Sequence, residues 1–224
     1  MHLLDKLIGV VAPHNCIGCG LEGDLLCGDC QQNKLILLPS FCYICKKETK
    51  NSAICSECAP GSSLKSVHIG CLYDGPANQL VQRLKFDRAR AAAATMARRL
   101  NTTLPALDTS ILITNVPTAT SRIRQRGYDQ AALLASALAS QRGLAYKPTL
   151  AKTNQLRQVG ASRQQRQTQS GVSFRVTSPK SVLGRHILLV DDVLTTGASL
   201  EACAKLLIQK GALSVRAAVF AHKL

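Results

Sequence analysis

The sequence predicts an α/β domain with a mostly parallel sheet flanked by helices, preceded by a small cysteine-rich module. Apolar strand-like runs alternate with amphipathic helical runs over residues 63–224, which is typical of a parallel sheet with helices on both faces. Eight of the ten cysteines form Cys-x-x-Cys pairs ahead of that region. The run Ala59–Ser63 is rich in turn formers, so we expect a module at 1–62 and a domain at 63–224.

The expected elements of the domain follow from the period of their apolar residues. The expected strands cover residues 67–73, 111–116, 187–190 and 215–220. The expected helices cover residues 76–84, 91–100, 128–141 and 199–209. The third of these helices has one apolar stripe and ends at Gly143. The strand over 187–190 is wholly apolar, as in strands that are covered on both faces.

The segment Gln155–Thr177 matches neither pattern, because it consists largely of Gln, Arg and Ser. A loop of this length inside a compact domain is usually functional. Its residues Arg157, Arg163 and Arg166 suggest two uses, which are closure over a bound ligand as a lid and contact with single-stranded nucleic acid.

Charge is distributed unevenly along the chain. The net charge is +15 at pH 7, yet residues 1–64 hold five Lys and six acidic residues, whereas residues 65–224 hold 23 basic and seven acidic ones. Between Arg122 and Arg185 there are twelve basic residues and one acid, Asp129. Such a field attracts phosphorylated ligands or nucleic acid, although a basic solvated surface is the alternative.

Composition indicates an ordinary hydrophobic core, with 46% hydrophobic residues and a mean hydropathy of +0.06. No apolar run approaches the ~18 residues that a membrane span needs. Met1–Val11 is too short for a signal peptide, and Asp5 and Lys6 interrupt it. We therefore expect a cytoplasmic protein without a membrane span.

The paired cysteines predict two structural zinc sites. The ligands would be Cys16, Cys19, Cys27 and Cys30 in one site, and Cys42, Cys45, Cys55 and Cys58 in the other. A two-residue gap directs both sulfurs at one ion, and four thiolates close a tetrahedron and leave no open position. Interleaved pairing of the first knuckle with the third is one alternative, and four disulfides are another. Cys71 and Cys203 stand outside the pattern, and we expect them to be buried apolar residues.

Residues 187–199 carry the most informative motif of the chain. A buried strand delivers Asp191 and Asp192 to its C-terminal end, where open α/β sheets bind ligands. The turn Thr195–Gly197 and a helix start follow, so backbone N–H groups and hydroxyls can surround a phosphate. The carboxylates are acceptors suited to a sugar diol. One site therefore offers acceptors for ribose hydroxyls and donors for a 5′-phosphate.

This stretch resembles the phosphoribosyl pyrophosphate (PRPP) motif of type I phosphoribosyltransferases. The resemblance implies that fold, with Asp191 and Asp192 as the catalytic pair that holds the ribose hydroxyls. The PRPP-binding residues that it implies are Asp191, Asp192, Val193, Thr195, Thr196, Gly197, Ala198 and Ser199.

Other segments are similar to proteins of the ComF/GntX group, the competence-associated branch of that fold. The similar segments are Leu3–Gly20, Tyr73–Phe86 and Val116–Gln130. We expect Lys85, Arg122 and Arg124 to contact the pyrophosphate, because cationic side chains pair well with its oxygens. We expect Arg126 to join Arg157, Arg163 and Arg166 in contacting nucleic acid.

The leading functional hypothesis is an enzyme that displaces pyrophosphate from ribose C1, with PRPP or another ribose 5-phosphate compound as substrate and Mg²⁺ on the leaving group. The alternative is a non-catalytic protein that retains the PRPP fold and binds single-stranded DNA. A PRPP-sensing regulator is a third possibility, although no helix-turn-helix segment is evident. The family resemblance adds DNA uptake and its helicase machinery as expected partners.

Overall fold

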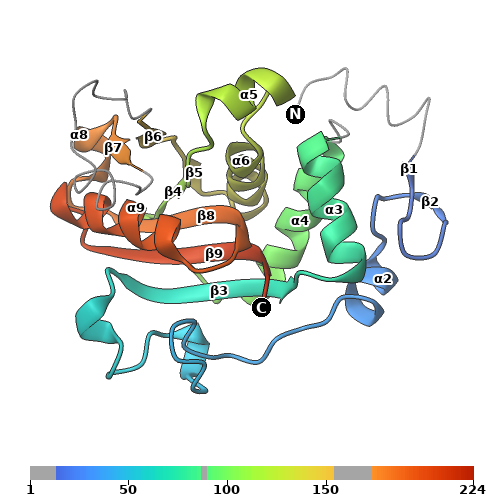
Figure 1. Ribbon diagram of the computed structural model, residues 1–224, viewed down its shortest axis with the longest axis horizontal. Coiled ribbons are helices and arrows are strands. Elements are labelled where there is room, and N and C mark those ends of the chain that lie inside the picture. The colour runs from blue at the N-terminus through green and yellow to red at the C-terminus, as the bar shows by residue number, and fades with distance from the viewer. Residues whose placement is uncertain (1–13, 87–89, 154–172) are drawn as a thin grey trace, which may run out of the picture.

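The computed structural model describes residues 14–86, 90–153 and 173–224 (Figure 1). Its centre is a five-stranded sheet in the order β3-β9-β8-β4-β5, and each neighbouring pair runs parallel. The strands are β3 (Leu64–Leu72), β4 (Leu112–Asn115), β5 (Ala145–Tyr146), β8 (His186–Leu194) and β9 (Ser214–His222). The predicted fold class is confirmed.

Helices and short strands surround this sheet. The helices are α2 (Gly28–Asn33), α3 (Gly75–Phe86), α4 (Arg90–Thr103), α5 (Thr120–Arg126), α6 (Gln130–Arg142), α8 (Pro179–Val182) and α9 (Ala198–Gln209). Two short antiparallel pairs are β1 (His14–Asn15) with β2 (Glu22–Gly23), and β6 (Leu150–Lys152) with β7 (Phe174–Val176). Single 3-10 turns cover Lys50–Ser52 and Ala59–Gly61. Among the described residues, no helix has the length and apolar character needed to cross a membrane.

The two faces of the sheet have separate hydrophobic cores, because successive side chains of a strand point to opposite faces. On one face, Leu188 and Val190 of β8 pack with α3, α4 and α6. On the other face, Ile187 and Leu189 pack with α9. Cys71 joins the first core and Cys203 the second, both fully buried as expected.

The N-terminal region contributes to both cores. The segment around Cys16 and Cys30 packs in the core of α3 and α4, whereas Tyr43 packs in the core of α9. Figure 1 shows α2 beside α3, well away from the chain after residue 40, which runs below β3. The two cysteine knuckles thus contribute to different cores, the first to that of α3 and α4 and the second to that of α9.

Several element boundaries differ from the prediction. β8 continues past Val190 to Leu194, because β9 pairs with it over this whole length, up to Leu194 opposite His222. The basic stretch from Arg122 to Arg126, which lies outside the expected helices and strands, belongs to helix α5, and Gly127 caps that helix with a φ of +82°. The next helix begins at Gln130, since the Asp129 carboxylate caps it by accepting the Ala132 N–H at 3.1 Å.

Candidate functional site

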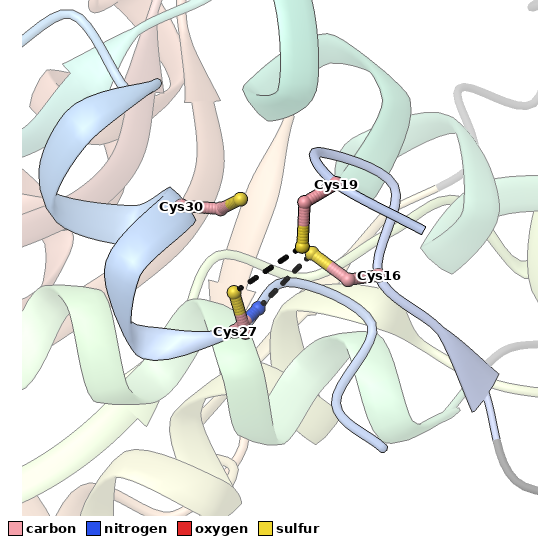
Figure 2. Close-up of side chains that lie close together, drawn as sticks. All are labelled: Cys16, Cys19, Cys27 and Cys30. Carbon is pink, nitrogen blue, oxygen red and sulfur yellow. Dashed lines mark hydrogen bonds between the residues drawn. The ribbon is translucent and has the colours of Figure 1, made fainter. Parts of the chain in front are cut away.

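The cysteine sulfurs gather into two clusters of four. Within each cluster all four sulfurs lie within 4.8 Å of one another. The first cluster contains Cys16, Cys19, Cys27 and Cys30 (Figure 2), and the second contains Cys42, Cys45, Cys55 and Cys58. The grouping is sequential, so the interleaved alternative is wrong, and all ten cysteines are free thiols.

The spacing and chemistry of these sulfurs fit a tetrahedral zinc ion. A Zn–S bond of about 2.3 Å places two ligand sulfurs about 3.8 Å apart. The sulfurs of Cys19 and Cys27 are 3.8 Å apart, and those of Cys45 and Cys55 are 3.5 Å apart. Each cluster could therefore hold one zinc ion with little rearrangement.

One thiol in each cluster is already disposed to ionise. Burial raises the pKa of Cys16, but backbone N–H groups of Cys27, Cys19 and Gly18 outweigh it and lower that pKa to about 6. The same balance lowers the pKa of Cys42 to about 6. Because the thiolate is the metal-binding form, each knuckle presents a ligand that is ionised at neutral pH.

The acid pair lies near the C-terminal end of β8. Asp192 is buried, and its carboxylate forms an ion pair with Lys85 at the end of α3, with 2.8 Å between Nζ and Oδ2. Burial and the neighbouring Asp192 charge raise the pKa of Asp191 well above its ordinary value. The ion pair takes up the Asp192 carboxylate only, so the Asp191 carboxyl keeps acceptor capacity for ligand hydroxyls or a metal ion.

The turn after β8 presents unused donors. Gly197 adopts φ +79° and precedes α9 without a side-chain cap. Thr195, Thr196 and Ala198 are exposed, and only a long contact of 3.4 Å links the Ala198 N–H to the Thr196 hydroxyl. The first N–H groups of a helix lack partners within it and attract anions. The geometry therefore suits a phosphate group.

Arg126 is half-buried and lies over the ring of Phe86, the last residue of α3. Its guanidinium carbon is 5.1 Å from the ring centre of Phe86, which is 63% exposed. Its Nε and Nη1 are buried and have no hydrogen-bond partner among the described residues. The expectation that Arg126 belongs with nucleic-acid contacts did not anticipate this position at the end of α3.

The remaining predicted cations are placed differently. Arg122 and Arg124 are exposed on α5, and within the described ranges the acid pair forms an ion pair with Lys85 and with neither of them. Arg157, Arg163 and Arg166 lie outside the described residues, so the proposed lid has no structural description here.

Sequence reasoning missed Tyr43, Glu201 and the serines at 62 and 63, which connect the second cluster to α9. Tyr43 and Glu201 are 158 positions apart in the chain. The only local signal was an aromatic residue directly after a cysteine ligand, and that signal names no partner.

The chain is similar to a known domain family and to several known proteins. The family model of the phosphoribosyl transferase domain matches residues 88–224, more than half of the chain. DNA utilization protein YhgH of Salmonella typhimurium is 30% identical over 224 residues, covering 81% of this chain and 96% of the relative. Competence protein F of Haemophilus influenzae is 29% identical over 209 residues, covering 83% and 91%. The solved glutamine phosphoribosylpyrophosphate amidotransferase of B. subtilis, complexed with ADP and GMP, aligns at a TM-score of 0.44 and 16% identity, covering 63% of this chain and 30% of that one.

Proposed function

Because the chain belongs to the phosphoribosyl transferase domain family, with competence protein F and DNA utilization protein YhgH as relatives, we propose that it binds PRPP with Mg²⁺ at Asp191–Ser199. One observation carries the proposal. Two consecutive carboxyls, one of them paired with Lys85, stand directly before a turn and a helix start that has no side-chain cap among the described residues. Together they match a ribose diol and its 5′-phosphate.

The proposed reaction is transfer of the phosphoribosyl group. An acceptor nucleophile forms a bond to ribose C1 while the bond from C1 to pyrophosphate breaks, and pyrophosphate leaves with both electrons. Asp191 and Asp192 accept hydrogen bonds from the ribose hydroxyls, and residues 195–199 donate to the 5′-phosphate. Bound Mg²⁺ would neutralise charge on the pyrophosphate.

Lys85 and Arg126 are the proposed contacts of the pyrophosphate. Lys85 is paired with Asp192, so a ribose hydroxyl that takes over this acceptor would release the ammonium group for a phosphate oxygen. The Nε and Nη1 of Arg126, which lies over Phe86 at the end of the same helix, would offer further donors. The exposed Arg122 and Arg124, expected to bind the same group, would reach it only from the rim of the site.

Lys85→Met tests this assignment. The substitution removes a charge-assisted hydrogen bond, so PRPP affinity measured by calorimetry with Mg²⁺ is expected to fall about ten- to hundredfold. Arg83→Met is the matched control, because Arg83 is an exposed cation on the same helix, and its affinity should stay unchanged. Equal losses of PRPP affinity in both variants would contradict the assignment, because net charge rather than a contact of Lys85 would then explain the loss. An unchanged protein that does not bind PRPP would refute the proposed function.

Single-stranded DNA binding is the second candidate function. Residues 65–224 hold 23 basic and seven acidic residues, and two close relatives carry names that refer to DNA use and competence. With eight aromatic residues and no Trp, the chain favours backbone electrostatics over base stacking. This role would bring DNA-uptake or helicase proteins as partners in a cytoplasmic setting, where thiols remain reduced for metal binding.

Arg122→Ala plus Arg124→Ala tests DNA binding. If both side chains contact phosphates, the slope of log affinity against log salt should become shallower by up to about 1.4. Lys205→Ala on α9 plus Lys210→Ala at its C-cap removes the same charge from exposed positions and serves as the control. Fluorescence anisotropy with a labelled oligonucleotide at several salt concentrations measures both. A salt-independent affinity in the unchanged protein would contradict the electrostatic model.

A further inference from the structure

The second cysteine cluster is attached to the turn that precedes α9. Tyr43 directly follows the cluster residue Cys42 and is 7% exposed. Its hydroxyl donates to Glu201 Oε1 at 2.7 Å, in the first turn of α9. Its ring also covers Gly197, since a Cβ added at Gly197 would lie 2.5 Å from Tyr43 Cε2. The Tyr43 side chain thus contacts Gly197, which precedes α9, and Glu201, which lies in its first turn.

The chain that leaves this cluster makes a second attachment to the same carboxylate. Ser62 donates its hydroxyl to Glu201 Oε1, and the Ser63 N–H donates to Oε2 at 2.9 Å. Both oxygens of Glu201 are therefore held by residues that flank the cluster, Tyr43 at its beginning and the two serines after its end. Folding of the cluster and placement of the α9 N-terminus are linked through three hydrogen bonds.

The attachment leaves the ligand-facing part of the turn free. Between the cluster and the turn lies a cavity of about 370 Å³, lined in part by Lys46, Thr195 and Thr196. Thr195 and Thr196 are exposed, whereas Gly197 is buried under Tyr43. Tyr43 therefore contacts the turn at Gly197, whereas Thr195 and Thr196 remain exposed to a ligand.

Within the part of the chain that the structure describes, the first cluster makes no such connection to α9. Cys16, Cys30 and Leu26 belong to the core of α3 and α4 on the opposite face of the sheet. Tyr43 belongs to the core of α9. The two clusters have the same ligand chemistry and different neighbours, so each serves as a control for the other.

We infer that the second cluster, when it holds its metal, positions the phosphate-binding turn through Tyr43 and Glu201. This inference rests on the proposed function, because it assigns the knuckle a part in PRPP affinity. Order imposed before the ligand arrives reduces the entropy lost on binding. Loss of the second metal should therefore weaken PRPP binding, whereas loss of the first should leave the turn in place.

A double-mutant cycle tests the contact. Gly197→Ala should weaken PRPP binding about hundredfold, because the new methyl group meets the Tyr43 ring and φ is left-handed. In a Tyr43→Ala background the collision is gone, so Gly197→Ala should cost at least about tenfold less. Tyr43→Phe keeps the ring and loses the bond to Glu201, which should preserve the full cost of Gly197→Ala. Equal costs in all three backgrounds would overturn the inference.

Hydrogen exchange gives a readout that needs no ligand. Cys55→Ser plus Cys58→Ser should lose one zinc and speed amide exchange at least about tenfold in the first hydrogen-bonded turn of α9, from Glu201 on. Cys16→Ser plus Cys19→Ser should lose the other zinc without that change. Unaltered exchange in the first variant would refute the coupling even if PRPP binds. Failure of the unchanged protein to bind PRPP would refute the proposed function alone.

Discussion

Replacement of Cys16 and Cys19 by Ala is expected to reduce the zinc content from two ions per chain to one and to unfold residues 14–34. Zinc binding contributes about 10–16 kcal/mol in small zinc modules, comparable to the ~5–15 kcal/mol that stabilises a whole domain. The first knuckle has little core of its own, and Leu25 and Leu26 are buried against α3 and α4. Its loss should therefore expose that core and lower the melting temperature.

Metal analysis, thermal unfolding and limited proteolysis together measure this result. Cys71→Ala is the matched control, because Cys71 is a fully buried cysteine outside both clusters and its replacement should leave two zinc ions. Proteolytic sites should appear within residues 14–34 in the knuckle variant only. A purified protein that carries no zinc, with four disulfides in its place, would contradict the assignment.

Asp191→Asn plus Asp192→Asn is expected to weaken PRPP binding at least about hundredfold, since hydrogen bonds to charged groups contribute about 1.5–3 kcal/mol each. Shape is kept, whereas the acceptors for the ribose hydroxyls are lost and Lys85 loses its partner. The fold should survive, because the core of β8 consists of apolar residues on either side of these positions. Calorimetry with Mg²⁺ measures the affinity, and circular dichroism with zinc content checks the fold.

The control for this pair is Asp24→Asn plus Asp108→Asn, which removes two exposed carboxylates and should leave the affinity unchanged. Acidification provides an independent check. An ordinary aspartate has a pKa near 3.9. Because the pKa of Asp191 is raised, its carboxylate becomes protonated at a higher pH than an ordinary aspartate does. PRPP affinity should therefore begin to fall at a pH above that ordinary pKa. Unchanged calorimetric affinity in the Asp191/Asp192 variant would show that the motif has another use.

Features that depend on a few consecutive residues are predictable from the chain alone. The apolar run before Asp191, the Thr-Thr-Gly turn and the paired cysteines each specify a local geometry, so the parallel sheet and both cysteine clusters appear where the sequence places them. The end of β8 is less predictable. Whether a strand stops before or after an acidic pair depends on the neighbouring strand, and β9 extends its pairing to Leu194.

Contacts between distant segments are decided only when the chain folds. Lys85 meets Asp192 because α3 packs on the face of the sheet that carries Leu188 and Val190 of β8. Tyr43 meets Glu201 because it belongs to the core of α9 on the other face. Neither pair has a spacing that could mark it in the sequence, since loop closure brings together residues of any separation at modest entropic cost. Residue type thus marks the candidate ligands and acceptors of this protein, whereas packing determines which knuckle contacts the turn before α9.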